Sequence, residues 1–174
     1  MRFLVCGSWR QALGVVLVAC GPLVASADEG LEWIERMNQA LVSRNYSGTF
    51  LHERGGQSES LQVHHRVRGG QISERLASLD GSGREFIRRG EEVIYVLPDQ
   101  QRLISERRPR NASLLPRFPQ LDERSAGLYV VSPVTRTRLT ARDVRLVSIT
   151  PRDPFRYGYR AWIDSRTHLP LKTE

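Results

Sequence analysis

Residues 156–172 carry the clearest alternation of apolar and polar positions in the chain. The first half of this segment places an aromatic or apolar residue at every second position, namely Tyr157, Tyr159, Ala161 and Ile163. A period of two is the period of a pleated strand. Residues 164–168 have turn chemistry, and Pro170 suits the first residue of a strand or an edge strand better than a strand interior. The pattern predicts a strand, a tight turn and the start of a second strand.

A different period appears at residues 28–45, where apolar residues recur at helical spacing. The members of this stripe are Trp33, Ile34, Met37, Ala40 and Leu41. Asp28 can cap the helix, because side-chain oxygens and acidic groups are favoured at a helix N-terminus. Asn45 suits a left-handed stop. We predict one α-helix here, with its stripe in the core.

From Ser47 onward the period of two returns and is interrupted by turn residues. The predicted strands cover residues 47–54, 58–68, 72–79, 84–89, 92–97, 101–106, 128–132, 134–139 and 144–150. Glycine pairs such as Gly55-Gly56 close hairpins, and the short connections leave no room for helical crossovers. In residues 58–68, His64 and His65 alternate between faces. The fold class is therefore mainly β (α+β), with a large antiparallel sheet.

The segment 107–121 breaks this rhythm and supplies the candidate binding residues. Long loops with exposed apolar side chains are often functional lids, and the alternative is a loop that folds back and buries those side chains in the core. The candidate contacts for acyl chains are Leu114, Leu115 and Phe118, and those for phosphate are Arg107, Arg108 and Arg110. Residues 121–128 are predicted as a short helix.

The first 27 residues are predicted to be a secretory signal peptide. Basic residues precede an apolar stretch that is too short for a membrane span, and the small residues Ala25-Ser26-Ala27 form a cleavage site. A lipoprotein signal is the open alternative, in which Cys20 is acylated and anchors the protein to a membrane. In the first interpretation, cleavage after Ala27 frees the exported protein from the membrane.

The charge and the cysteine content limit the classes of binding partner and the covalent bonds that we expect. Cys6 and Cys20 both precede Ala27, so the mature chain has no disulfide and no thiol. Arg2 and Arg10 account for two of the 26 basic residues, which leaves 24 against 19 acidic residues and a formal net charge of +5. In an exported protein this charge favours anionic lipid head groups or acidic protein segments over nucleic acid. A solvated arginine-rich surface is the alternative.

The sequence contains no recognisable catalytic or metal-binding constellation. Adjacent His64 and His65 point to opposite faces of a strand and cannot chelate one ion together, and His52 adds no ligand spacing. No Gly-x-Ser-x-Gly motif, phosphate loop or paired-carboxylate signature of an active site is present. We predict a protein that is not an enzyme and has no cofactor or metal.

Several segments are similar to the MucB/RseB family of periplasmic regulators of an envelope-stress sigma factor. The segment Tyr46-Ser-Gly-Thr-Phe-Leu-His-Glu-Arg54 resembles the first strand of the family. The segment Glu74-Arg-Leu-Ala-Ser-Leu-Asp-Gly81, followed by Arg84-Glu-Phe-Ile-Arg88, resembles its central hairpin. The most specific segments are Thr150-Pro-Arg-Asp153 and residues 156–172. The similarity runs from about Leu31 to the end of the chain. His168 stands where the family often has glycine, and a positive φ there would be less comfortable for histidine.

This resemblance implies a half-open antiparallel barrel with covering helices, similar to the lipoprotein carriers LolA and LolB. It implies that residues 28–174 form a lipid-sensing N-terminal domain, and that the family's smaller C-terminal domain is missing from a truncated chain. It also implies a partner, the periplasmic domain of a membrane-bound anti-sigma factor of the RseA/MucA type. Binding would shield this partner from proteolysis, and lipopolysaccharide or another acylated lipid would release it. A lipid or lipoprotein carrier is the alternative function, and a homo-oligomer is left open.

Overall fold

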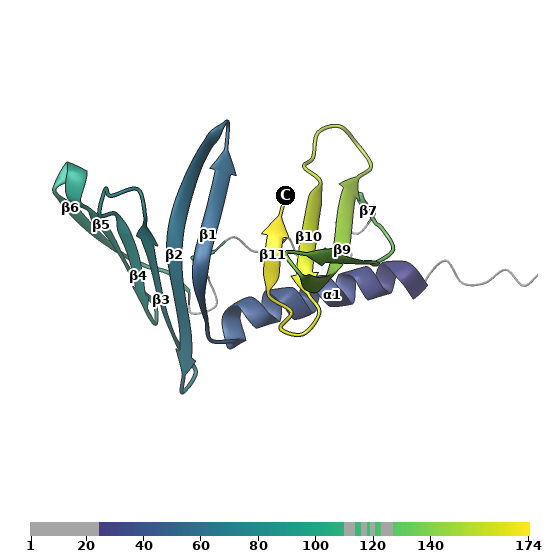
Figure 1. Ribbon diagram of the computed structural model, residues 1–174, viewed down its shortest axis with the longest axis horizontal. Coiled ribbons are helices and arrows are strands. Elements are labelled where there is room, and N and C mark those ends of the chain that lie inside the picture. The colour runs from purple at the N-terminus through teal and green to yellow at the C-terminus, as the bar shows by residue number, and fades with distance from the viewer. Residues whose placement is uncertain (1–24, 110–113, 116–117, 119–120, 123–126) are drawn as a thin grey trace, which may run out of the picture.

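The computed structural model describes residues 25–109, 114–115, 118, 121–122 and 127–174. These residues form one α-helix, one short 3-10 helix and eleven strands in antiparallel sheets (Figure 1). The predicted mainly β fold class is confirmed. The signal peptide prediction concerns residues that lie almost entirely outside the described part of the chain.

Helix α1 (Ala25–Ser43) buries the predicted apolar stripe. Met37 is fully buried, and Trp33 and Ile34 lie beside it in the core. The helix begins before the predicted cap at Asp28, which instead lies in its first turn. Asn45 is not left-handed, so that prediction is wrong. Its side-chain oxygen accepts a hydrogen bond from the backbone N–H of Val67 at 2.7 Å, which fixes the passage from the helix to the first sheet.

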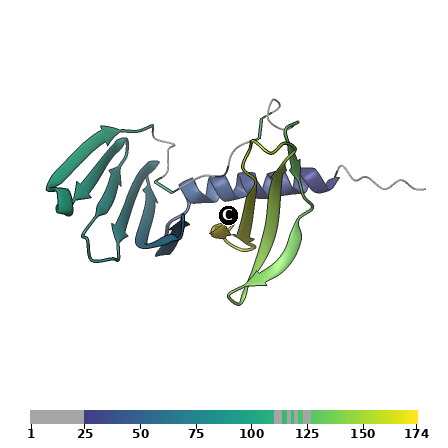
Figure 2. The ribbon, with the colours of Figure 1, turned by 90° about the horizontal axis from the view of Figure 1, so that it is seen from above.

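The first sheet is a six-stranded meander in the order β1-β2-β3-β4-β5-β6. Consecutive strands pair because each hairpin connection is short. The strands are β1 (Tyr46–Arg54), β2 (Gln57–Arg68), β3 (Gln71–Ser78), β4 (Glu85–Arg89), β5 (Glu92–Leu97) and β6 (Arg102–Arg107), with the 3-10 helix η1 (Pro98–Gln100) before β6. This sheet lies beyond the C-terminal end of α1 (Figure 2).

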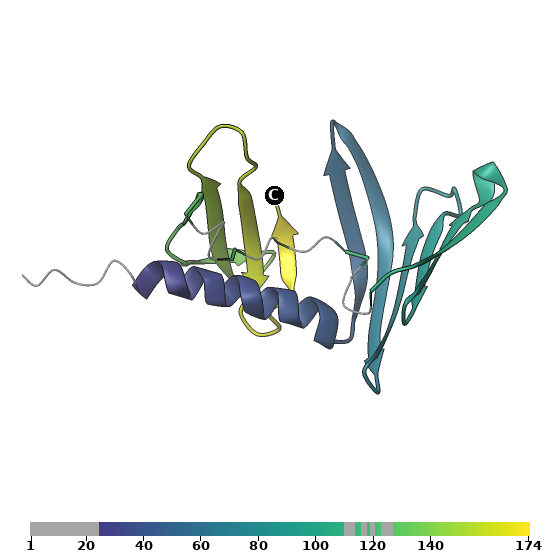
Figure 3. The same cartoon turned by 180° about the vertical axis from the view of Figure 1, so that it is seen from behind.

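The second sheet has the order β11-β10-β9-β7, and β8 also pairs with β9. Its strands are β7 (Tyr129–Val131), β8 (Thr135–Leu139), β9 (Arg142–Pro151), β10 (Tyr159–Asp164) and β11 (Pro170–Thr173). Helix α1 crosses one face of this sheet and contacts β7, β9 and β10 (Figure 3). The main core is this interface, where Trp33, Met37 and Ile34 meet Val147, Ile149 and Ile163.

The structure differs from four of the expectations. The strands form two hydrogen-bonded sheets, and the described residues contain one covering helix where several were expected. Residues 121, 122, 127 and 128 are not helical, and the rest of the predicted helix at 121–128 lies outside the described residues. The strand expected from residue 156 begins at Tyr159, because residues 153–156 form a side-chain-bonded turn.

Candidate functional site

One face of the six-stranded sheet carries a row of apolar side chains. Direct pairing between neighbouring strands places one residue of each strand in line, and such partners share a face. This apolar row consists of Gly48, Val63, Leu76, Phe86, Tyr95 and Ile104. Val63 and Leu76 are buried, whereas Ile104 at the far edge is 44% exposed. The row therefore passes from core to open surface along one face.

Leu114 and Leu115 pack on this same face. Both are half-buried and contact the cluster built on Leu61, Val63 and Leu76. They cover the buried end of the apolar row and leave its outer end less covered. A partly covered apolar sheet face of this kind can accept an acyl chain or an apolar side chain of a partner.

A row of ionisable side chains, which we call the buried charge row, runs beside the apolar row on the same face. His65, Glu74 and Arg88 are direct cross-strand neighbours on β2, β3 and β4. Their side chains are between 0% and 1% exposed. Glu74 Oε1 lies 3.6 Å from His65 Nε2, and Glu74 Oε2 lies 3.4 Å from Arg88 Nη1. Buried charges need such partners, because desolvation makes an isolated charge very costly.

The buried charge row also holds three separate pieces of backbone. His65 Nδ1 donates to the carbonyl of Arg44 at 2.7 Å, since a carbonyl can only accept, and the imidazole stacks on Tyr46. Arg88 Nη2 donates to the carbonyl of Pro109 at 2.9 Å. Glu74 Oε2 accepts from the N–H of Leu114 at 3.1 Å. The row thus links the end of α1, the sheet and the segment that carries Leu114.

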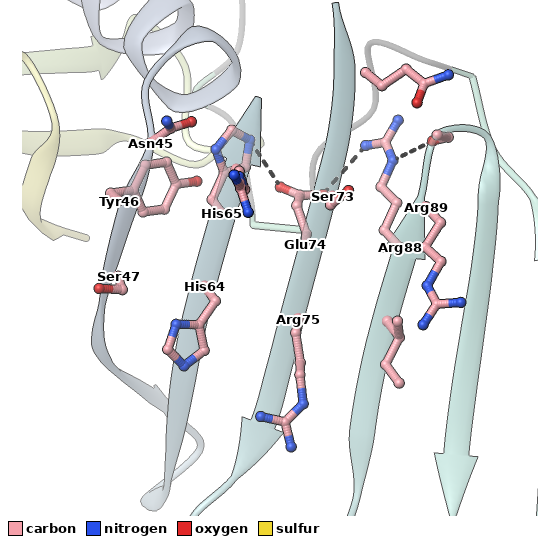
Figure 4. Close-up of a pocket in the computed structure, with 14 residues that line it drawn as sticks. Asn45, Tyr46, Ser47, His64, His65, Ser73, Glu74, Arg75, Arg88 and Arg89 are labelled. Carbon is pink, nitrogen blue, oxygen red and sulfur yellow. Dashed lines mark hydrogen bonds and ion pairs between the residues drawn. The ribbon is translucent and has the colours of Figure 1, made fainter. Parts of the chain in front are cut away.

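The opposite face of the same sheet is polar and hollow. His64, Arg75 and Arg89 of this face contribute to the lining of a depression of about 900 Å³ (Figure 4). The buried residues His65, Glu74 and Arg88 also contribute to its lining. The exposed His64 and the buried His65 lie on different faces, as the alternation predicts. Arg75 is held by Glu85, with Nε and Oε2 3.0 Å apart. Free guanidinium groups on this face would attract anions.

The structure distributes the six predicted contact residues over different environments. Arg108 lies on the apolar face with Leu114 and Leu115, where it donates to Glu106 and to the hydroxyl of Tyr95. Burial and the hydrogen bond to Glu106 raise the pKa of Tyr95, whereas hydrogen bonds from Tyr95 and Arg108 lower the pKa of Glu106. Glu106 is therefore a carboxylate that fixes Arg108 beside the apolar row.

The other three candidates do not join this group. Arg107 pairs across the sheet with Glu92, on the polar face, so it lies on the wrong side for Leu114. Phe118 is buried in the main core against α1, as the folded-back alternative requires. Arg110 lies outside the described residues. A lipid-binding role for these side chains stays a prediction.

Sequence reasoning missed the buried charge row, although a signal for it exists. His65 shares its strand face with Leu61 and Val63, and Glu74 shares its face with Leu76. An ionisable residue on the apolar face of a strand indicates that a polar partner is buried beside it.

The described part of the chain shows no group of three or more side chains suited to a metal ion. In that same part, no helix is both long enough and apolar enough to cross a bilayer.

Fold and site together define a binding protein, built on antiparallel sheets with one partly open apolar face and one polar, basic face. The chain belongs to the MucB/RseB family, because the model of the MucB/RseB N-terminal domain matches residues 29–174. The predicted resemblance is confirmed.

Known relatives agree with this assignment. The chain is 31% identical over 166 residues to the sigma factor AlgU regulatory protein MucB of Pseudomonas aeruginosa, which covers 91% of this chain and 50% of that protein. It is 31% identical over 142 residues to the sigma-E factor regulatory protein RseB of Salmonella typhimurium, covering 81% and 44%. The chain thus spans about half the length of the relatives it matches. These relatives are named as regulatory proteins.

Two solved structures have a similar fold. A crystal structure of MucB matches with a TM-score of 0.64 and 32% identity, covering 88% of this chain and 53% of that one. The complex of Pseudomonas aeruginosa MucA and MucB matches with a TM-score of 0.63 and 28% identity, covering 83% and 50%.

Proposed function

We propose that this protein is a periplasmic negative regulator of a sigma-E-type factor that acts by masking. It binds the periplasmic domain of a membrane-bound anti-sigma factor and shields that domain from proteolysis. The observation that carries this proposal is the similarity to MucB, which has been crystallised in complex with periplasmic MucA and matches 82% of this chain. Relatives named as sigma factor regulators support the same conclusion.

We further propose that an acylated lipid, such as lipopolysaccharide, releases the anti-sigma factor. The apolar row offers the surface that an acyl chain requires, and its outer end at Ile104 is accessible. Each buried methylene contributes about 0.8 kcal/mol, so chain burial would dominate the affinity. Arg108 stands beside this row and would contribute selectivity for an anionic head group.

The test is a titration of the chain from residue 28 with a fluorescent peptide of the anti-sigma periplasmic segment, followed by lipopolysaccharide. We expect the anisotropy to rise on binding and to fall as lipid displaces the peptide. Ile104→Asp should weaken lipid binding, whereas Leu103→Asp should not, because adjacent residues of β6 point to opposite faces. Failure of the peptide to bind would refute masking, and binding without displacement would refute release alone.

A lipid or lipoprotein carrier is the second candidate, favoured by the same partly open apolar row. Native mass spectrometry would reveal co-purified lipid, and a donor and an acceptor vesicle population would measure transfer. Net transfer in the absence of any anti-sigma segment would favour the carrier, and tight retention of lipid without transfer would favour the regulator.

A further inference from the structure

The loop between β9 and β10 exposes two aromatic side chains to a degree that needs an explanation. Phe155 is 92% exposed and Tyr157 is 84% exposed, more than any other large apolar side chain in the described residues. Both lie outside the two hydrophobic clusters. Single exposed apolar residues are ordinary, but two aromatic rings at one loop tip mark an interaction site. We call residues 152–158 the aromatic loop.

Asp153 holds the aromatic loop through hydrogen bonds to its backbone and to a neighbouring side chain. Asp153 Oδ1 accepts from the N–H of Phe155 at 3.0 Å, and Asp153 Oδ2 accepts from Arg156 Nε at 2.8 Å. These two hydrogen bonds lower the pKa of Asp153 and keep it a carboxylate. A Cβ at Gly158 would lie 3.2 Å from the carbonyl oxygen of Ile149, so the loop rests tightly on β9. A preformed loop loses little entropy on binding.

The surroundings of the two rings are basic. Arg152 is exposed at the base of the loop, and Arg156 neutralises Asp153, the only acidic residue of the loop. The turn between β1 and β2, which follows the exposed Arg54, lies at the same end of the molecule as the aromatic loop (Figures 1 and 3). A flat anionic surface that meets this end would therefore meet two aromatic rings and several guanidinium groups together.

We propose that the aromatic loop docks the protein on an anionic membrane surface. Phe155 and Tyr157 insert at the level of the lipid head groups, and Arg152 and Arg54 face the phosphates. Aromatic side chains are favoured at the membrane interface, and basic neighbours add attraction to anionic lipids. The depression lined by His64 and Arg75 does not include the loop, and the strong exposure of both rings suits insertion into a surface. This proposal does not depend on the anti-sigma partner.

Cosedimentation of the chain from residue 28 with vesicles tests the proposal. We expect binding to vesicles of phosphatidylethanolamine and phosphatidylglycerol, and several-fold weaker binding when phosphatidylcholine replaces phosphatidylglycerol. The double substitution Phe155→Ala and Tyr157→Ala should lower the partition coefficient by about tenfold. Leu103→Ala is the matched control, since Leu103 is also highly exposed, at 69%, but lies on β6.

Two further variants separate charge from insertion. Arg152→Ala should weaken vesicle binding more than Arg136→Ala, which removes the same charge from an exposed position on β8. In Tyr157→Trp, tryptophan emission should shift to shorter wavelength when anionic vesicles are added. The proposal is overturned if the unaltered chain ignores anionic vesicles, or if the double variant binds them as well as Leu103→Ala does. A double variant that loses only the anti-sigma peptide would make the loop a protein-docking element instead.

Discussion

Removal of the negative charge from the buried charge row should destabilise the protein strongly. In Glu74→Gln the side chain keeps its volume, and its amide oxygen can still accept from the N–H of Leu114. Arg88, with a side chain 0% exposed and 3.4 Å from Glu74, would lose the attraction of this carboxylate. Two unit charges at that separation attract by about 5 kcal/mol at an effective dielectric constant of about 20. Loss of one partner of a buried pair usually costs about 3–5 kcal/mol, so we expect a loss of about 3–4 kcal/mol.

Urea denaturation followed by circular dichroism measures this loss at neutral pH. The control is Glu85→Gln on the neighbouring strand, because Glu85 pairs with Arg75 at the surface, where the two side chains are 27% and 45% exposed. Such exposed pairs contribute about 0–1 kcal/mol. Apolar replacement of both partners, Glu74→Leu with Arg88→Met, should recover most of the stability, since no buried charge is left without a partner on β4. Equal unfolding free energies for Glu74→Gln and Glu85→Gln would refute the argument.

Three other substitutions test local geometry. Gly158→Ala should lower the unfolding free energy by roughly 1–3 kcal/mol, because the added Cβ would lie 3.2 Å from the carbonyl oxygen of Ile149. Gly48→Ala is the control and should change the stability little, because no atom lies within 4 Å of a Cβ at that position. Equal melting temperatures of the two variants would contradict this expectation. His168 has φ of 59°, so His168→Val should destabilise by about 1–2 kcal/mol relative to His168→Asn, a difference that thermal unfolding would detect. Burial acts to raise the pKa of Asp164, but hydrogen bonds from the turn that follows outweigh it and lower the pKa. The ionised Asp164 therefore adds stability above the unfolded-state pKa of about 3.9, and this is lost as the pH falls through the lower folded-state value; acid titration of Asp164→Asn should show a shallower loss below about pH 4.

Most strands were predictable because they alternate with a period of two, and because glycine or proline directly follows β1, β2, β4 and β5. The order of the six-stranded sheet follows from its short hairpins. Helix α1 was predictable from the spacing of Trp33, Met37 and Leu41. These signals are local, so they can be recognised in the sequence without knowledge of the tertiary structure.

The site depends on long-range pairing, which a single sequence does not encode visibly. Phe118 and Leu115 are three residues apart, yet they pack in different hydrophobic clusters. Arg107 and Arg108 are adjacent but serve opposite faces, which the alternation could have indicated once β6 was known to extend to Arg107. Residues 156–158 of the aromatic loop were predicted as part of a strand, because Tyr157 continues the alternation of β10. The Asp153 turn overrides that pattern.

The partners of α1 have a consequence for the order in which the chain folds. The six-stranded meander contains only contacts between neighbours in sequence, so it can close in small steps. The apolar stripe of α1 packs instead on β9 and β10, more than a hundred residues further along the chain. Closing so long a loop carries an entropic penalty before any contact forms. During synthesis, Trp33 and Met37 would therefore stay uncovered until β9 and β10 have emerged, and their exposed apolar stripe is a surface that a chaperone could bind.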